Sequence, residues 1–178
     1  MANDKKLIAG ITAGNEKSLE ILIDRYSEPL CNFVLQITGS KDLSEEVVAD
    51  VFINLWKIKE NLVIQSSLRA YLYRSCRNRA LDQLYKEKKF QADGIDSFTQ
   101  IKSSTSADGD LNLMELNAQI DFLISEMPRQ KQQIFRMSRI DGLKYKEIAE
   151  VLSISVNTVQ NHMVEAVEFM AKRKLNLF

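Results

Sequence analysis

The side chains with the clearest chemical potential are uncharged polar groups near the C-terminus. They carry amides and a hydroxyl that both donate and accept hydrogen bonds: Asn157, Thr158, Gln160 and Asn161. Such groups match the donors and acceptors that base edges present in the major groove of DNA. Ser155 precedes them and is expected to cap a helix that begins here. His162 follows; we expect it on the surface or partly packed, and a phosphate contact is its functional interpretation.

The residues around this polar run predict two short helices joined by a tight turn. The first helix has an apolar face of Ile148, Val151 and Leu152, and its Ala149 is small enough for another helix to cross closely. Ser153 and Ile154 form the turn. The second helix turns its apolar positions inward: Val156, Val159, Met163 and Ala166. This pattern favours a helix-turn-helix that binds DNA; the alternative is an ordinary helical hairpin with a solvated polar face.

A second segment combines positive charge with aromatic rings. From Arg69 to Lys89 the sequence holds seven basic residues against two acidic ones, with three tyrosines among them. Arginines attract phosphates, and aromatic rings stack on exposed bases. Apolar positions at helical spacing supply a buried stripe: Leu68, Leu72, Cys76, Ala80 and Leu84. The alternative is a basic surface helix that only adds solubility.

A third helix is expected from Leu43 to about Lys59. Asp42, three residues before Glu45, predicts a capping box at its start. Its apolar stripe includes Val47, Val51 and Leu55, and the opposite face presents Glu46, Asp50, Ile53 and Lys57. This face is either solvated or a docking surface, and Ile53 among the charges is unusual for a purely solvated one.

These elements belong to a chain of 178 residues with zero formal net charge. Val, Ile and Thr form no alternating runs, so we predict an all-α protein. Between two helical zones, residues 91–111 are rich in Ser, Asp and Gly and hold four acids against one base, which is typical of a flexible linker. We therefore predict two small helical domains, residues 1–90 and 112–178, the second containing the helix-turn-helix.

Several classes of function are disfavoured. Cys31, Cys76 and the single histidine are too few for a zinc site, so no metal or other cofactor is expected. The cysteines are expected to be reduced core residues of a cytosolic protein. No nucleophile–base pair or Gly-rich phosphate loop is present, so we do not expect an enzyme. The apolar stretch from Leu7 to Ile11 is too short for a signal peptide or for membrane insertion.

Four stretches resemble parts of the extracytoplasmic-function (ECF) sigma factors of bacterial RNA polymerase. Tyr145 to Leu152 resembles the family's "sykEIAelL", and residues 123–135 resemble the helix before it. Residues 42–57 resemble "aeDlvQevFlrlW", and residues 67–89 resemble "slraWLyriarNlalDylRr". Tyr71 replaces the frequent Trp, and Arg79 stands where an apolar residue is usual. The C-terminal part alone also resembles the output domain of LuxR-type regulators, because Thr158-Val159-Gln160-Asn161-His162 fits its Thr-Val-x-Asn-His pattern.

The sigma-factor resemblance implies a different function for each of the two domains. Residues 1–90 would bind core polymerase through Glu46, Asp50, Ile53 and Lys57. The same domain would open the minus-10 promoter element through Arg69, Tyr71, Tyr73, Arg74, Arg77 and Asn78. Residues 112–178 would bind the minus-35 element through Ser155, Asn157, Thr158, Gln160, Asn161 and His162. The acidic linker would thread through the polymerase, which itself performs nucleotidyl transfer.

The resemblance also implies an anti-sigma factor as a partner, beside core RNA polymerase and promoter DNA, and a cytoplasmic location. Two alternatives remain at this point. A LuxR-like regulator that works without being a polymerase subunit predicts strands in the first half, and a helical adaptor that binds only proteins predicts no use for the basic helix.

Overall fold

All regular structure in the described part of the chain is helical. The computed structural model describes residues 2–64, 66–92 and 119–175, and no strand occurs in these ranges. The chain divides into two compact units, Met1–Gln100 and Ile101–Phe178. The all-α prediction is confirmed. Of the predicted linker, residues 93–111 lie outside the described residues, whereas Gln91 and Ala92 form the end of a helix rather than a linker.

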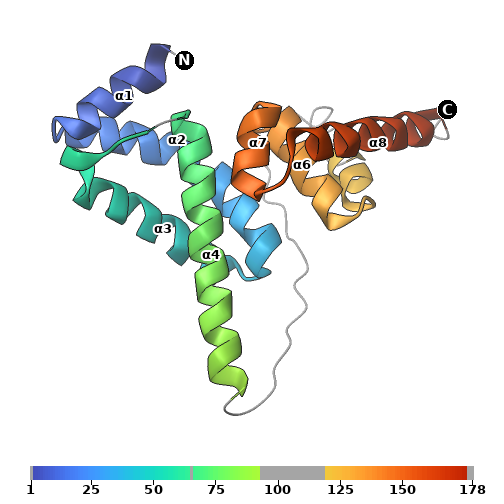
Figure 1. The fold of residues 1–178 in the computed structure, drawn as a ribbon, viewed down its shortest axis with the longest axis horizontal. Coiled ribbons are helices and arrows are strands. Elements are labelled where there is room, and N and C mark those ends of the chain that lie inside the picture. The colour runs from blue at the N-terminus through green and yellow to red at the C-terminus, as the bar shows by residue number, and fades with distance from the viewer. Residues whose placement is uncertain (1, 65, 93–118, 176–178) are drawn as a thin grey trace. The chain divides into compact units, whose positions relative to one another are not determined.

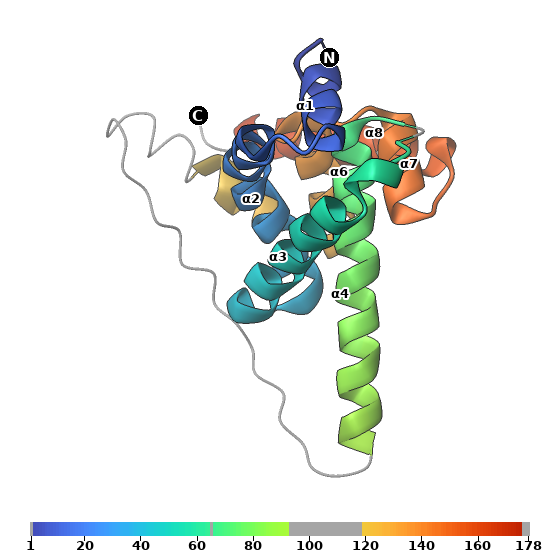
Figure 2. The ribbon, with the colours of Figure 1, turned by 90° about the vertical axis from the view of Figure 1, so that its left-hand side faces the viewer.

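The described residues of the first unit form four α-helices and one short 3₁₀ helix. These are α1 (Ala2–Thr12), α2 (Glu16–Thr38), α3 (Lys41–Lys57), η1 (Lys59–Asn61) and α4 (Leu68–Ala92). Helices α2 and α3 pack against each other and against α4, while α1 packs on α2 (Figure 1). The C-terminal half of α4 extends beyond α2 and α3 (Figure 2). That half is therefore available for contacts outside this unit.

The turn between α2 and α3 corrects the predicted helix start. Gly39 ends α2 in the left-handed conformation (φ 69°), which a residue without Cβ adopts without strain. Ser40 then has extended dihedrals, and its hydroxyl accepts a hydrogen bond from the Leu43 amide at 3.3 Å. Ser40 is thus the N-cap, and the capping box predicted for Asp42 and Glu45 is wrong, because the chain enters the helix two residues earlier.

Helix α4 buries one face along its first half. Leu68, Leu72, Cys76 and Ala80 are almost fully buried, as the sequence predicts, and Leu84 is half-buried. The Cys76 thiol has no route to water, and desolvation by burial raises its pKa to about 12. Burial disfavours the charged thiolate, so Cys76 behaves as a small apolar core residue. The packing of this face fixes which residues of α4 point outward.

The second unit contains the predicted helix-turn-helix. A helical segment at residues 119–125 precedes α6 (Arg129–Arg139), α7 (Tyr145–Leu152) and α8 (Val156–Leu175). Ser153 takes a left-handed conformation (φ 57°), and the Ile154 amide donates to the Ala149 carbonyl at 3.1 Å. The Ser155 hydroxyl then accepts from the Thr158 amide at 3.0 Å, which confirms Ser155 as the helix cap. The turn therefore needs only three residues to redirect the chain.

The core of this unit is apolar, and each of the helices among its described residues contributes to it. It includes Ile124, Met127, Ile134, Met137, Ile148, Ala149, Val151, Val159, Met163 and Ala166. The predicted inward positions of α8 are confirmed, except that Val156 at its first turn is only half-buried. Since this row of α8 is buried, the row on its opposite side faces solvent.

Candidate nucleic-acid interface

The N-terminal turns of α8 present amide side chains to solvent. Asn157, Gln160 and Asn161 are exposed, one or two turns from the helix start. Ser155 and Thr158 differ from them, because their hydroxyls lie 2.7 Å apart and hydrogen-bond to each other. These two residues therefore shape the start of the helix, while the three amides are positioned for contacts with base edges.

His162 is half-buried beside this amide row. Its Nδ1 atom is shielded from solvent and has no hydrogen-bond partner among the described residues. The neighbouring Glu165 forms an ion pair with Lys131, which lowers the pKa of that carboxyl, and His162 adds to the effect. This geometry fits a partly packed histidine.

The entrance of α7 adds positive charge that the sequence analysis did not single out. The Glu147 carboxylate accepts a hydrogen bond from the Lys144 backbone amide at 2.7 Å and so fixes the first turn. The side chains of Lys144 and Lys146 are both exposed there. In a helix-turn-helix the first helix crosses the DNA backbone, so cations at its start can meet phosphates. Their proximity to the predicted reading helix could have indicated this role.

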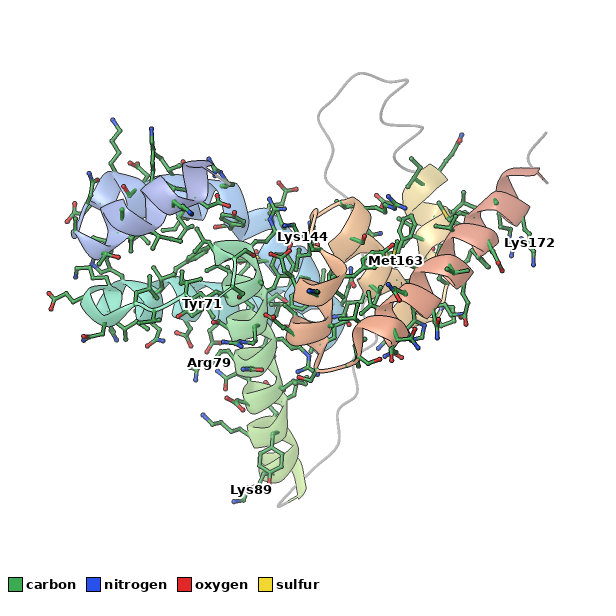
Figure 3. The ribbon with its side chains drawn as sticks, turned by 45° about the horizontal axis from the view of Figure 1, so that its top comes forward. Tyr71, Arg79, Lys89, Lys144, Met163 and Lys172 are labelled. Carbon is green, nitrogen blue, oxygen red and sulfur yellow. The ribbon has the colours of Figure 1, made fainter. Side chains whose placement is uncertain are left out.

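The exposed face of α4 carries most of the predicted minus-10 residues. Arg74 and Asn78 are exposed, and Tyr71 and Arg77 are half-buried on the same helix. Figure 3 places Tyr71, Arg79 and Lys89 along α4, from the packed half to the projecting end. Tyr85 on the projecting half is 71% exposed, more than any other tyrosine or phenylalanine among the described residues. It was not among the predicted site residues.

Tyr73 corrects the prediction for this face. Its side chain is only 1% exposed, and its ring packs against Phe33 of α2 with the ring centroids 4.9 Å apart. A ring enclosed in the core cannot stack on a base, so Tyr73 is not a DNA contact in this fold. Arg69 is also partly engaged, because its guanidinium lies over the Tyr26 ring at 6.0 Å.

The predicted docking face of α3 is partly occupied by α4. The Arg79 guanidinium donates two hydrogen bonds to one carboxylate oxygen of Asp50, the Nε bond at 3.0 Å. Gln83 reaches Glu46 at 3.4 Å. Ile53, by contrast, is 52% exposed, and Lys57 is exposed as well. The carboxylates at this face thus contact side chains of α4, while Ile53 and Lys57 remain available to a partner.

The two helical units match the two parts of one family. The model described as "Sigma-70 region 2" matches residues 22–90, which span α2 to α4. The model described as "Sigma-70, region 4" matches residues 117–170, which include the helix-turn-helix. The two matches lie in separate units, the region 2 match in the first and the region 4 match in the second.

Known proteins are similar to this chain over most of its length. The ECF RNA polymerase sigma-E factor of Haemophilus influenzae is 21% identical, over 96% of this chain and 94% of that protein. The sigma-E factor of Escherichia coli K12 is 23% identical over 93% and 91%. The solved structure of the sigma factor RpoE from Bartonella quintana has a TM-score of 0.65 at 17% identity, covering 88% of this chain and 96% of that one.

These matches define an all-α, two-part transcription initiation protein. The chain belongs to the sigma-70 family, as an ECF sigma factor. It directs core RNA polymerase to promoters for transcription initiation, the activity of a family of non-enzymatic DNA-binding factors. The LuxR-like alternative is not favoured, because the first half matches sigma region 2 and its described residues form no strand.

Two further findings concern the described residues only. None of their helices is both long and apolar enough to cross a membrane. No group of three or more His, Cys, Asp or Glu side chains among them is arranged to hold a metal ion.

Proposed function

We propose that residues 1–90 bind core polymerase and open the minus-10 element, that residues 112–178 bind the minus-35 element, and that residues 91–111 link the two. The observation that carries this proposal is that α4 and α8 each bury an apolar row and expose polar groups suited to nucleic acid. Run-off transcription with purified core polymerase tests it. A promoter-specific transcript that requires both halves supports the proposal, and a transcript from residues 1–90 alone contradicts it.

For the minus-35 element, Asn157, Gln160 and Asn161 contact base edges. Ser155 and Thr158 hold the helix start in place, and His162 makes a phosphate contact beside them. Loss of one bidentate base contact costs about 1–3 kcal/mol of discrimination. Asn161→Ala should therefore relax base preference at one promoter position, measured by binding of the holoenzyme to singly substituted promoters. Gln130→Ala removes an exposed amide from α6 and should leave the preference unchanged.

For the minus-10 element, Tyr71, Arg74, Arg77 and Asn78 form the contact face of α4, with Arg69 at its edge. A base that stacks on an aromatic ring gains about 1–3 kcal/mol. Tyr71→Ala should weaken binding of the holoenzyme to single-stranded minus-10 DNA, while Tyr71→Phe, which keeps the ring, should restore it. Equal losses in both variants would show that the hydroxyl, not stacking, makes the contact.

For polymerase docking, Ile53 and Lys57 make the direct contacts on α3, and Glu46 and Asp50 border them. Ile53→Glu places a charge in the apolar centre of this surface and should reduce co-elution with core polymerase. Ile21→Glu is the matched control, since Ile21 is 42% exposed on α2 rather than on this face of α3. If both variants bind equally well, α3 does not carry the docking surface.

The chain also has an anti-sigma partner under this proposal, and it acts in the cytoplasm with the polymerase. The support is that the similar RpoE structure is described in complex with the anti-sigma factor NepR. The tagged chain is purified from cells that have not received the signal that activates this sigma factor. The expected result is a co-purified protein that competes with core polymerase for the chain. Recovery of polymerase alone, in uninduced cells, contradicts it.

A further inference from the structure

An apolar side chain stands in the amide row of α8. Val164 is 58% exposed, in the third turn of the helix. Its neighbour Met163, labelled in Figure 3, is buried in the core of the unit. Single exposed apolar residues are common on proteins, so exposure alone assigns Val164 no role. The position of Val164 relative to the amides does suggest a role.

Helical geometry places Val164 on the same side of α8 as the amides, one turn beyond Gln160 and Asn161. With about 100° of rotation per residue, the side chains at 157, 160, 161 and 164 fall within an arc of about 100°. Val159, Met163 and Ala166 occupy the opposite side and are buried. Val164 lies about 10 Å along the axis from Asn157, roughly three base-pair steps of duplex DNA. Any duplex that contacts the amides therefore approaches Val164.

The spacing itself is that of a helix lying in the major groove. Residues at relative positions 0, 3, 4 and 7 contact bases when a recognition helix of the homeodomain type enters the groove. Asn157, Gln160, Asn161 and Val164 have this spacing, but only the first three can form hydrogen bonds. The apolar group that the major groove offers to the fourth position is the C5-methyl of thymine.

The charges beyond Val164 set the end of this surface. Glu165 is held by Lys131, with the ion pair at 2.5 Å, so its carboxylate is directed to the protein. Glu168 is exposed one turn further, where its charge repels phosphates. Val167, 45% exposed, lies next to Glu168 and outside the first turns that contact bases. Val167 is therefore the matched control for Val164.

We propose that Val164 is a specificity-determining residue that contacts the C5-methyl group of a thymine in the minus-35 element, which α8 meets as duplex DNA. The inference rests on the proposed minus-35 function of α8 and adds one base position to it. A thymine and a uracil differ only by this methyl group, which allows a test that changes nothing else in the duplex.

The experiment uses holoenzyme assembled from the full-length chain and core polymerase. Each thymine of the upstream element, on either strand, is replaced in turn by deoxyuridine, and binding is measured for the wild type, Val164→Ala and Val167→Ala. One replacement should weaken the wild type about fourfold, the effect of one buried methyl group. Holoenzyme with Val164→Ala should bind the unsubstituted promoter about fourfold more weakly than the wild type does, and its binding should no longer respond to that replacement. Val167→Ala should remain sensitive.

The outcomes separate this inference from the function on which it rests. If ordinary base substitutions in the upstream element leave holoenzyme binding unchanged, α8 does not contact that element and the proposed function fails. If base substitutions matter but no deoxyuridine affects the wild type, or Val164→Ala keeps the wild-type sensitivity, the Val164 inference alone is overturned. Circular dichroism of both variants confirms that each remains folded.

Discussion

Tyr71 and Tyr73 lie two residues apart on α4 but in opposite environments. Tyr73 packs against Phe33 in the core, whereas Tyr71 is half-buried at the edge of the exposed face. The apolar stripe predicted for α4 places Tyr73 on the same side as Cys76 and Ala80, and Tyr71 on the opposite side, so helical spacing could have distinguished the two rings. The ring that Tyr73 contacts, Phe33, is forty residues away and could not be identified from local spacing.

The difference between the two tyrosines is measurable. Tyr73→Ala should lower the free energy of unfolding by about 3–5 kcal/mol, the usual cost of removing a buried aromatic ring. Tyr71→Ala should change it by less than about 1 kcal/mol, as is common for partly exposed positions. Urea denaturation followed by circular dichroism gives both values. A small effect for Tyr73→Ala would show that its ring is not part of the core.

The two cysteines should differ in reactivity. The thiolate is the nucleophile, and burial raises the pKa of Cys76 to about 12, so almost none is ionised at pH 8. Cys31 is half-buried, and its pKa is raised less, first by burial and then by Glu45. At pH 8 a thiol reagent should modify Cys31 slowly and Cys76 only after denaturation. Cys31→Ser should therefore leave the native protein unreactive; rapid labelling of that variant would contradict the burial of Cys76.

The same burial makes stability depend on alkaline pH. The folded protein binds the Cys76 proton more tightly than the unfolded chain does, since the folded pKa is raised from 9.0 to about 12. The contribution is fully present below pH 9 and is lost as the pH rises toward 12. Unfolding midpoints measured from pH 8 to 11 should fall less steeply in Cys76→Ala than in the wild type, although the variant begins from a lower stability.

At the scale of elements, the turn between α7 and α8 contains a removable strain. Ser153 has a left-handed backbone, which costs a residue with a Cβ roughly 1 kcal/mol or more. Ser153→Gly removes this cost but gains freedom in the unfolded chain, so the net stabilisation should be at most about 1 kcal/mol. Ser153→Ala keeps the Cβ and should give no gain. Thermal unfolding of the full-length chain compares the two, and an equal response would show that the backbone conformation is not the cause.

The helix-turn-helix could be predicted from sequence because its determinants are local. The Ser155 cap, the small Ala149 and the inward row of α8 are all set by residues within a few positions of one another. The start of α3 is also set by local residues, but the sequence offers two candidate caps there. The pair Asp42 and Glu45 fits a capping box, and this pattern conceals the true cap, Ser40. The serine follows a glycine that ends α2, and this glycine decides which polar residue caps.

The contact between α3 and α4 could not be predicted in the same way. Asp50 and Arg79 are separated by 29 residues, and each one alone suggests a free charge on a surface helix. The pairing gives the Arg79 guanidinium a carboxylate partner on the neighbouring helix. Sequence reasoning assigned Asp50 to polymerase docking, and the structure shows that its carboxylate also pairs with Arg79 of α4.

This ion pair should contribute little to stability. The two side chains are 39% and 35% exposed, and exposed pairs are typically worth between 0 and about 1 kcal/mol. Asp50→Asn should thus change the free energy of unfolding by less than about 1 kcal/mol, with a smaller effect in an Arg79→Gln background. A double-mutant cycle in urea at low and high salt measures the coupling, which should decrease as the salt concentration rises.

At the scale of the whole molecule, positive charge is concentrated in short segments, and each domain as a whole is close to neutral. Residues 1–90 hold fourteen bases against twelve acids, residues 112–178 hold nine against eight, and residues 91–111 hold one against four. Binding to duplex DNA depends mainly on phosphate neutralisation, with a log–log salt slope of about −0.9 per phosphate contacted. Neither helical domain therefore has a strong overall attraction for DNA, although each exposes a polar face suited to it.

This distribution predicts that the free protein binds duplex promoter DNA weakly. Tyr71 on α4 suits unstacked bases, which a closed duplex does not present, and the acids of residues 91–111 repel DNA. In the holoenzyme the minus-10 duplex is opened and residues 91–111 are held away from the DNA, which should relieve both constraints. Core polymerase should also hold the two reading helices at a fixed separation. Once the first helix is bound, the second then binds at a high effective concentration.

Fluorescence anisotropy with labelled promoter DNA, at several salt concentrations, tests this prediction. The protein alone should show weak binding that decreases steeply with salt and differs little between promoter and scrambled duplex. Addition of core polymerase should make binding tight and promoter-specific. Asn161→Ala should then reduce the preference for the promoter without affecting the weak binding of the free protein, since that binding depends on phosphates and not on bases. Tight, promoter-specific binding by the protein alone at physiological salt would mean that α8 needs no second site, and that the polymerase does not supply the specificity.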